Sequence, residues 1–540
     1  MNKLSLYTNT IRMLRPIQIL SRVRPTARVF GGKMSPNTVN AVRIACPELD
    51  EDVSYLRRFD VDALKRNIFV LINESHQIDL DQWNCSKASH LWNFNLHYFE
   101  YCIPLAVRFG RFRDEADYAL FKRLVSSWIE ACRYPNGDAW HPYTISLRLI
   151  NWLICCGYFG DSLLEDQVFY QRLCDSMYLQ YRHLLINQET RLLGNHYWEN
   201  LKTLVILSLC FEEPDILATV ERKLLHQLDE QILSDGVHFE RSFMYHKIVL
   251  EGLVRLKLAY ESAARLTPEP IEDGIRRMND AMVSIERNVG KTPFFNDAAD
   301  GVSKTARSLS LACIREFGYV ADSAITEFPQ SGFYKLYNSE SALVFFAGFP
   351  GPAYMLGHSH CDVLSFELSL GGRPLFVNSG TYAYQTSLRS YFRSDSAHNV
   401  AVRTGHDQML CWGAHRVAKG IKSVEIDSIS SNYITASFMD WEGILHKRTI
   451  TLSGNRLKVE DWINANSDIV SFLKIAPEHT VSLEGNVVMV RGGEREIRVA
   501  SDAKPFLEKS PYSPEFGIIE NVDRLCFMSD SAYCSYEIEW

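Results

Sequence analysis

The sequence predicts an α+β protein with two large domains, a helical N-terminal domain followed by an antiparallel β-sandwich. The first observation is the length of 540 residues, because single hydrophobic cores stop growing near ~250–300 residues and longer chains divide. The second is the hydrophobic pattern, whose period changes from helical to alternating after about Phe328. We therefore expect an N-terminal arm over residues 1–50, a helical domain over 51–325 and a β domain over 326–540.

Apolar residues that recur at steps of three and four predict the helical domain. The pattern is clear over 166–186 and returns in several later segments, which are 145–160, 198–212, 215–233, 247–265 and 271–290. Spacing of this kind places the apolar side chains on one helix face. Short breaks such as Glu213-Pro214 separate the segments, so we expect a run of antiparallel helix pairs.

Alternating residues and turn signals predict the β domain. From Leu364 to Leu370 apolar residues alternate with polar ones, and Gly371-Gly372 then leads into a second apolar run that begins at Pro374. Two further hairpins are predicted around Ser453-Gly454-Asn455 and after Val487–Val490, since turn residues separate two short alternating runs. These features are typical of an antiparallel sandwich.

Composition narrows the classes of protein and of partner. A formal net charge of −8 argues against a general nucleic-acid-binding protein, so no nucleic acid is expected as a partner. Thirteen cysteines without a CxxC pair are typical of reduced, buried thiols. The basic N-terminal segment lacks the continuous apolar region of a secretory signal, and no window reaches the ~20 apolar residues of a membrane span. We expect a soluble cytoplasmic protein, with a periplasmic location less favoured and membrane-surface contact through the Arg-rich start as an alternative.

Polar residues gather most densely between residues 357 and 399. The segment contains His358, His360 and, 38 residues after His360, His398. Histidines two apart on an extended chain point the same way, and a third from a neighbouring strand could complete a metal site. Because the chain has 16 histidines, chance clustering is the alternative.

Two more clusters lie in the helical half, at Gly194–Asn200 and at Asp235–His246. Asn195 is as well suited to capping a helix as to a site, and its neighbours His196 and Trp198 favour a site. In the second cluster Asp235-Gly236 marks a turn. Tyr245 there is either a half-buried packing residue or a functional one.

The three clusters, in this order, resemble the heparinase II/III family of polysaccharide lyases. The resemblance rests on NHYWEN, DGVHFERSFMYH, GHSHCDVLSFELSLGGRPLFVNSGTYAY and RSDSAHNVAV, and spans roughly residues 90–420. It implies an incomplete (α/α) toroid followed by a layered antiparallel β-sandwich. It also implies β-elimination on a uronate-containing glycan, an acidic polysaccharide or oligosaccharide.

The resemblance assigns roles to four catalytic candidates. Asn195 would bind the uronate carboxylate and spread the charge of the intermediate, with His196 beside it. Tyr245 would take the C5 proton, donate to the leaving oxygen, or do both, and His358 would be a second acid/base or a carboxylate neutraliser. A phenol ionises near a pKa of ~10, so Tyr245 would need positive neighbours such as Arg241, His246 or His358 to act as a base.

Further residues match the family's metal and substrate positions. His360 and His398 match a structural zinc site found in some members, but its third ligand, an aspartate, is Asn378 here, which should weaken binding unless Asp362 or water substitutes. Without metal, the two histidines would support the catalytic loop by hydrogen bonds. No organic cofactor is expected. The substrate-binding candidates are Arg241, Tyr384, Arg389, Arg393, Trp140 and His141. Arginines suit carboxylates, with surface solvation as the alternative for the residues of the segment 382–393. Trp140 and His141 resemble the lining of the family's cleft, with packing between helices as the alternative.

The sequence leaves three functions open. A lyase leads, and a uronyl C5-epimerase of surface polysaccharide biosynthesis follows, because it removes the same C5 proton with nearly the same residues. A non-catalytic glycan-binding protein is the third, and the retained Asn195, His196, Tyr245 and His358 argue against it. The identity of the uronate, the endo or exo mode and the oligomeric state stay open.

Overall fold

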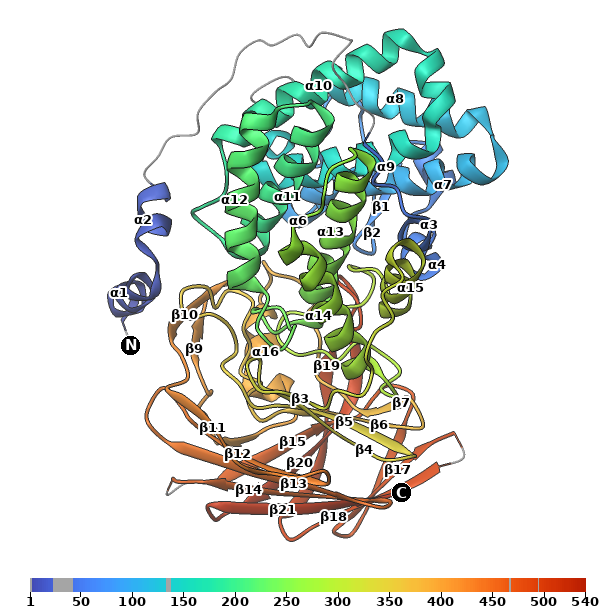
Figure 1. Cartoon of the computed structure of the whole chain (residues 1–540). Coiled ribbons are helices and arrows are strands. Elements are labelled where there is room, and N and C mark those ends of the chain that lie inside the picture. Colours follow the sequence, from blue (N-terminus) through green and yellow to red (C-terminus); the bar gives the residue numbers. More distant parts are fainter. Residues whose placement is uncertain (1, 23–41, 133–136, 466–467, 494) are drawn as a thin grey trace.

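The computed structural model describes residues 2–22, 42–132, 137–465, 468–493 and 495–540. Helices make up one half of the molecule and β-sheets the other (Figure 1). The last helix of the first half is α15 (Ala306–Phe317), and the first strand of the second half is β3 (Glu327–Phe328). The predicted fold class, an incomplete toroid followed by an antiparallel sandwich, is confirmed.

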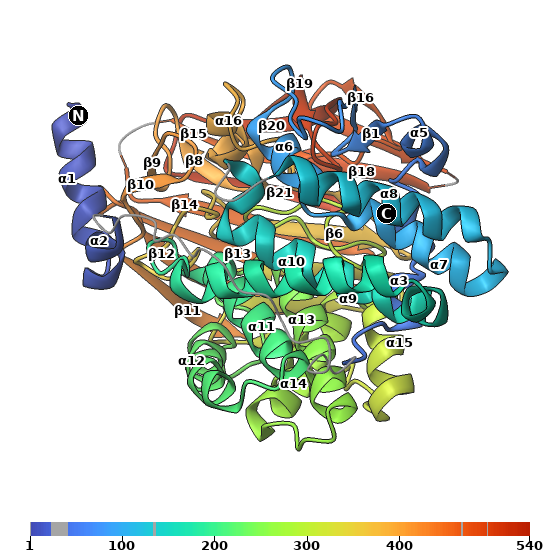
Figure 2. The same cartoon turned by 90° about the horizontal axis from the view of Figure 1, so that it is seen from above.

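The toroid is built from helix pairs in two layers (Figure 2). Its inner helices, each next to the following one, are α7 (Ile103–Phe112), α9 (Pro142–Glu165), α11 (Gly194–Cys210) and α13 (Phe243–Ser262). The outer helices are α8 (Glu115–Ala131), α10 (Gln167–Ile186), α12 (Pro214–Gln231) and α14 (Glu269–Glu286). The inner helices α11 and α13 are buried along nearly their whole length, which explains why their apolar pattern is less one-sided than that of the outer helices.

Shorter elements complete the helical half before α7. They are α3 (Pro47–Asp50), α4 (Val53–Leu56), α5 (Val61–Lys65), the hairpin β1 (Ile68–Leu71) and β2 (Glu74–Gln77), and α6 (His90–Leu96). No helix in the described part of the chain is both long and apolar enough to span a membrane.

The β half contains three main antiparallel sheets. The five-stranded sheet nearest the toroid (Figure 1) holds β3, β4 (Phe333–Tyr337), β5 (Ser341–Phe346), β6 (Phe366–Leu370) and β7 (Arg373–Phe376). The eight-stranded sheet runs β11 (Ser423–Ile429), β12 (Tyr433–Met439), β13 (Leu445–Ser453), β14 (Arg456–Ile463), β21 (Tyr533–Glu539), β18 (Arg495–Ser501), β17 (Val487–Gly492) and β16 (Thr480–Glu484). The four-stranded sheet runs β19 (Lys504–Tyr512), β20 (Glu520–Ser529), β15 (Ile469–Lys474) and β8 (Ala401–Arg403).

The hairpin predicted around Ser453-Gly454-Asn455 is confirmed by the pairing of Ser453 with Arg456. The strand predicted from Leu364 begins instead at Phe366, because Leu364 has a φ of +65°. Both faces of β6 are buried. Its polar residues face the loop between α14 and α15: Ser369 Oγ donates to Val289 O at 2.7 Å, and Glu367 Oε1 accepts from Phe294 N at 3.0 Å.

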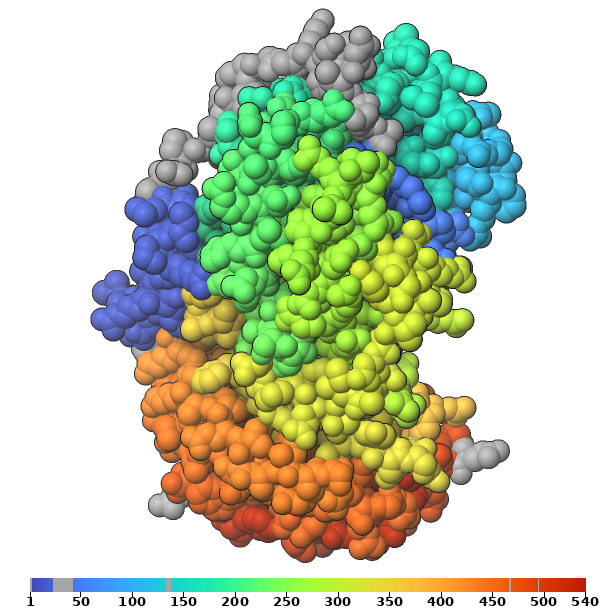
Figure 3. Space-filling model, viewed as in Figure 1, coloured from blue at the N-terminus to red at the C-terminus, as the bar shows by residue number. Residues whose placement is uncertain are grey.

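The N-terminal arm, α1 (Lys3–Met13) and α2 (Pro16–Arg22), lies beside a small hairpin of the β domain, β9 (Leu410–Trp412) and β10 (Arg416–Lys419) (Figure 1). Trp412 Nε1 donates to Thr10 Oγ1 at 3.0 Å, and the Trp412 ring meets Tyr7 edge-on at 4.7 Å. On the toroid side, Arg15 pairs with Glu230. In the space-filling view the arm packs against both domains (Figure 3).

Candidate active site

A cavity of about 780 Å³ lies between the toroid and the β domain. Its wall combines α9, α11 and α13 with the β-domain segments 353–358, 382–386 and 415–417, and with arm residues that include Thr10, Leu14 and Arg22. The volume suits a short stretch of sugar. Four of the sequence candidates, Asn195, His196, Tyr245 and His358, line this cavity, and so does Tyr384.

The centre of the site is a chain of three side chains from both domains. Tyr245, in the first turn of α13, stacks on His358 with ring centroids 4.5 Å apart and planes 10° apart. The Tyr245 hydroxyl is 3.4 Å from His358 Nε2 and 2.9 Å from the Tyr384 hydroxyl. On the far side of the imidazole, Nδ1 donates to Glu240 Oε2 at 2.5 Å. Glu240 thereby fixes the ring and leaves Nε2 directed at the phenol.

Burial and charge set the protonation of this chain. Burial lowers the pKa of His358, but the Glu240 carboxylate outweighs this, so the pKa is raised above its ordinary value. Burial raises the pKa of Tyr245 well above that of a free phenol, and neighbouring Tyr384 and carboxylates raise it further. Of the three positive neighbours expected for Tyr245, only His358 contacts its hydroxyl. Arg241 and His246 bond to backbone carbonyls instead.

Asn195 lies inside α11, not in a loop before it. Leu193, with a φ of +63°, precedes the helix, and no side chain caps this N-terminus. Asn195 Nδ2 donates to the Tyr143 hydroxyl at 3.1 Å, while its buried Oδ1 has no partner among the described residues. The capping alternative is therefore excluded, and one amide atom is left for a ligand.

His196 sits over the Tyr143 ring with centroids 4.2 Å apart. Its Nδ1 is 3.0 Å from the buried carboxylate of Glu189, which Asn200 also contacts. Glu189 orients the imidazole in the way that Glu240 orients His358.

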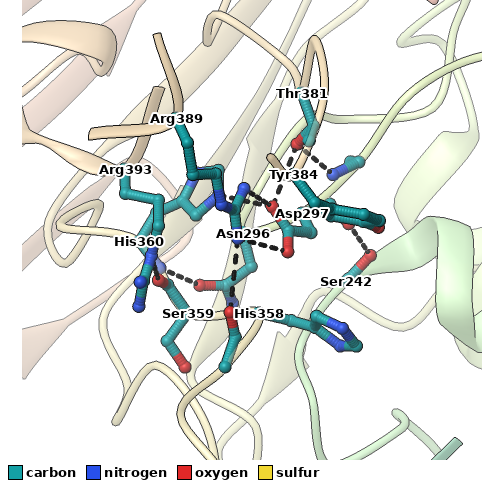
Figure 4. A network of polar contacts seen from close by, with 12 residues as sticks. Ser242, Asn296, Asp297, His358, Ser359, His360, Thr381, Tyr384, Arg389 and Arg393 are labelled. Atoms are coloured by element: carbon teal, nitrogen blue, oxygen red, sulfur yellow. Dashed lines mark hydrogen bonds and ion pairs between the residues drawn. The ribbon is translucent and has the colours of Figure 1, made fainter. Parts of the chain in front are cut away.

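Asp297 holds the segments around the site together (Figure 4). Both of its oxygens accept from the Arg389 guanidinium, and Oδ1 also accepts from His360 Nε2 at 2.8 Å and Thr381 Oγ1 at 3.2 Å. Its backbone N–H donates to His358 O at 3.0 Å, and its carbonyl accepts from Ser242 Oγ, the N-cap of α13, at 2.6 Å. Asp297 thus connects the loop of His358 to the helix of Tyr245.

His360, His398 and Asn378 form a buried hydrogen-bonded row. His360 Nδ1 is 3.3 Å from His398 Nε2, and Asn378 Oδ1 is 3.1 Å from the outer nitrogen of His398, Nδ1. Asp297 takes the outer nitrogen of His360, and no third His, Cys, Asp or Glu donor joins the facing pair within the described ranges. This arrangement falls short of the three protein ligands of a zinc site. The three residues alone thus do not complete the expected zinc site, and their hydrogen bonds join His360, after the loop of His358, to Asn378.

Five substrate-binding candidates lie outside the cavity lining. Arg389, on the short helix α16 (Arg389–Arg393), binds Asp297, and Arg393 donates to the carbonyls of Leu356, Ser359, Ala414 and Arg416. Arg241 donates to the carbonyls of Phe239, Gln330 and Ser331. Trp140 is buried and donates to Cys132 O at 2.9 Å, and His141 accepts from Tyr143 N at the start of α9. The two α16 arginines thus donate to backbone carbonyls of the loop that carries His358.

Several residues of the site were missed by sequence reasoning. Glu240 stood inside the motif that was noted, but nothing there distinguished it from a surface acid. Asp297 had no local signal, since its partner Arg389 is 92 positions away, and Glu189 lies outside the motif that contains its partner His196. Arg191 and Arg416 line the cavity but belong to no motif.

Family comparisons agree with this geometry. The family model of the heparinase II/III N-terminus matches residues 53–317, and that of the heparinase II/III-like C-terminal domain matches residues 321–540. The chain belongs to the heparinase II/III-like family. It is 24% identical over 408 residues to FtsZ-localized protein C of Caulobacter vibrioides, over 72% of this chain and 67% of that protein.

A second relative is a heparin-sulfate lyase of Bacteroides thetaiotaomicron, 22% identical over 428 residues, 68% of this chain and 58% of that enzyme. The match thus spans less than two thirds of that enzyme's length. Among solved structures, heparinase III aligns with a TM-score of 0.69 at 17% identity, covering 97% of this chain and 88% of the other. A mutant of heparan sulfate lyase HepC from Pedobacter heparinus aligns with a TM-score of 0.61 at 16% identity, covering 97% and 87%. These likenesses establish the shared fold.

Proposed function

We propose that this heparinase II/III-like chain is a polysaccharide lyase that cleaves a uronic-acid-containing glycan by β-elimination. The observation that carries the proposal is the Glu240–His358–Tyr245 chain at the cavity wall. Elimination requires a base for the C5 proton and an acid for the departing C4 oxygen. His358 and Tyr245, whose rings are stacked, can supply the base and the acid at one place in the cavity.

The protonation of Tyr245 supports its role as the acid, and His358 in its neutral form is the proposed base. Because the pKa of Tyr245 is raised, the phenol keeps its proton at neutral pH and donates it to the C4 oxygen. His358 Nε2, with Glu240 behind the ring, takes the C5 proton. The C5–H and C4–O bonds break and a C4–C5 double bond forms. The products are an unsaturated uronate and a neighbouring sugar whose anomeric carbon keeps the departing oxygen as a new hydroxyl, that is, a new reducing end.

The acidity of C5 depends on the neighbouring carboxylate, and Asn195 is the group proposed to bind it. A half-turn of its amide would present Nδ2 to the carboxylate, with Oδ1 accepting from the Tyr143 hydroxyl, since a hydroxyl can donate as well as accept. His196 with Glu189 stands next to this pair. Charge that develops in the intermediate would be stabilised by fixed donors.

An acidic substrate also fits the end of the cavity beside the arm. Arg22, Arg191 and Arg416 line it, and none of them forms an ion pair with a carboxylate in the described part of the chain. Burial lowers the pKa of Arg22, as do the charges of Arg191 and Arg416, so the three guanidinium groups lie close enough to repel. Carboxylate or sulfate groups of a glycan would relieve this repulsion.

The position of the two proton-transfer groups favours elimination over epimerisation. Tyr245 and His358 are stacked, so both approach a bound sugar from the same side. An epimerase must return a proton to the opposite face of C5. A lyase with both groups on one side removes the proton and the leaving group from the same face.

The test is a panel of heparan, chondroitin, hyaluronan, alginate and bacterial capsular polysaccharides. The ultraviolet absorbance of the C4–C5 double bond is followed while NMR monitors exchange of the C5 proton in deuterated water. We expect absorbance to rise with one class of glycan. Exchange without absorbance would replace the lyase with the epimerase, and the absence of both across the panel would favour the non-catalytic glycan-binding protein.

A further inference from the structure

A second set of metal-type donors comes from residues close in sequence to His360 and His398. Ligand atoms of Cys361, Asp395 and Asp407 all lie within 4.8 Å of one another. Cys361 and Asp395 are buried and Asp407 is exposed. Cys411 packs against the same small cluster as Cys361. We propose that Cys361, Asp395 and Asp407 bind a zinc-type divalent ion, with Cys411 or water in the fourth position.

The first support is an unsatisfied carboxylate oxygen. Asp395 is 2% exposed, and its Oδ1 has no hydrogen-bond partner among the described residues. Its Oδ2 accepts from Gln408 N at 3.0 Å, and its own N–H donates to Asp407 Oδ1 at 3.2 Å. A buried polar atom without a partner is costly unless a hydrogen-bond donor or a metal compensates it.

The second support is that neither carboxylate has an ion-pair partner among the described residues. The nearest arginines in sequence, Arg393 and Arg403, are committed to backbone carbonyls and to Glu442. No lysine, arginine or histidine ion pair to Asp395 or Asp407 is formed by the part of the chain that the structure describes. A divalent cation would supply the missing positive charge.

The donor types select the class of ion. Two carboxylates with one thiol, or with two thiols if Cys411 joins, suit zinc, whereas magnesium and calcium prefer sites made of oxygen alone. Binding would form the metal–sulfur bond as the Cys361 thiol loses its proton to solvent. The proposed ion would then lie a few residues along the chain from His360 and His398, where zinc was expected.

Such an ion would join three segments of the cavity wall. Cys361 follows the loop of His358, Asp395 begins the 3₁₀ turn η4 (Asp395–Ala397), and Asp407 precedes the hairpin β9–β10. That hairpin carries His415 and Arg416 to the cavity and contacts the arm. The proposed ion is a brace between the catalytic loop and the arm-binding hairpin, and it does not depend on which reaction the site performs.

The test uses the full chain stripped with a chelator and then titrated with Co²⁺ and Zn²⁺. We expect one equivalent of Co²⁺ to bind with a near-ultraviolet thiolate-to-cobalt charge-transfer band, and Zn²⁺ to displace it and raise the melting temperature. Cys361→Ser should abolish the band. Asp407→Asn changes an exposed position and should leave folding intact. It removes one ligand and should weaken Co²⁺ affinity at least about tenfold, which corresponds to about 1.4 kcal/mol.

Cys46→Ser is the matched control, because Cys46, Glu48 and Glu316 form the other group of possible ligands in the described chain. It should leave the band unchanged. Failure of the wild-type chain to bind Co²⁺, or a band that is lost in Cys46→Ser and kept in Cys361→Ser, would overturn the proposal. Full Co²⁺ affinity in Asp407→Asn would also contradict it, even if Cys361→Ser does not fold.

Discussion

At the level of single residues, the site depends on how a carboxylate sets the charge of a histidine. His358 has a raised pKa because Glu240 outweighs the effect of burial, and it must be neutral to accept the C5 proton. Activity should therefore fall as the pH drops through this raised pKa. The acidic limb of the pH profile is a direct readout of the Glu240–His358 contact.

Glu240→Gln removes the negative charge that raises the pKa of His358. The pKa should fall, so the acidic limb of kcat/KM should move to lower pH, while the maximal rate drops roughly 10²-fold as the ring loses its acceptor. Steady-state rates measured across pH check this. A shift of the alkaline limb instead would mean that His358 acts as an acid, and an unmoved profile would remove Glu240 from the mechanism.

Asp297 carries the stability of the site. Burial raises its pKa, but Arg389 and His360 outweigh this and hold the pKa well below its ordinary value. Its contribution is therefore complete above the unfolded pKa of ~3.9 and is lost as the pH falls toward the folded value. Asp297→Asn leaves Arg389 buried and unpaired, which should cost about 3–5 kcal/mol of unfolding free energy near neutral pH.

Urea denaturation at several pH values measures this loss. The control is Asp273→Asn, which breaks an exposed pair with Arg277 in α14 and should cost less than about 1 kcal/mol. Equal losses in the two variants would show that Asp297 is no more than a surface charge.

Individual residues also mark the limit of what the sequence predicts. Tyr245, His358 and Asn195 could be found because each stands in a short motif that resembles a family pattern. The acids that orient them could not be found, because the sequence around a carboxylate in a loop is the same whether the carboxylate contacts solvent or a histidine far away in sequence. Arginines suggested substrate carboxylates, yet Arg389 and Arg393 use their donors inside the protein.

At the level of elements, the period of the hydrophobic pattern predicts whether a segment is a helix or a strand better than it predicts where the element begins and ends. The helices over 166–186 and 215–233 correspond closely to α10 and α12, because both are outer helices with one buried face. The helix predicted from residue 198 begins at Gly194 instead, since polar residues in its first turns face a cavity and break the apolar pattern. The site residues therefore sit on a rigid helix.

The N-terminal arm lines part of the cavity, which the sequence could not suggest. It carries cavity-lining residues from the extreme N-terminal helices, and its contact with β9–β10 depends on Tyr7, Thr10 and Trp412. Contacts between residues about 400 positions apart leave no local pattern. We expect the arm to contribute to substrate binding and not to the chemical step.

Tyr7→Ala should loosen the arm, because it removes the ring that packs on Trp412. With Arg22 less well held, KM for the acidic glycan should rise several-fold, up to about tenfold for one lost charged contact of about 1.4 kcal/mol, with kcat nearly unchanged. Leu4→Ala, on a side chain that is 75% exposed, is the control. A fall in kcat at constant KM would contradict this role.

At the level of the whole molecule, the two domains form one cavity only because they are tightly joined. Gly290, after α14, has a φ of +83°, and an added Cβ would lie 1.8 Å from Gly372 O in the turn between β6 and β7. Lys335 in β4 donates to Ser284 O at 2.6 Å at the end of α14. Helical and β segments meet here through a backbone contact at Gly290 that leaves no room for a side chain, and through the side chain of Lys335.

Gly290→Ala should therefore lower the free energy of unfolding by more than backbone strain alone would, because the new Cβ would also clash with Gly372 O. Gly318→Ala is a matched control, because Gly318 also has a positive φ, +72°, but faces open space; it should cost about 1–2 kcal/mol. Chemical denaturation of both variants measures the difference. If Gly290→Ala costs no more than Gly318→Ala, the domains are less closely joined than described.

The central claim is that Tyr245 protonates the leaving group of a uronate elimination. The most direct measurement is the rate of double-bond formation by the wild type, Tyr245→Phe and Tyr260→Phe, on whichever glycan the wild type cleaves. Tyr260 lies on the same helix and its hydroxyl binds Glu221, so its variant also loses one buried hydroxyl but outside the cavity. We expect Tyr245→Phe to lose about 10²–10⁴-fold at unchanged melting temperature while Tyr260→Phe stays close to wild type. Wild-type rates in Tyr245→Phe would contradict the account.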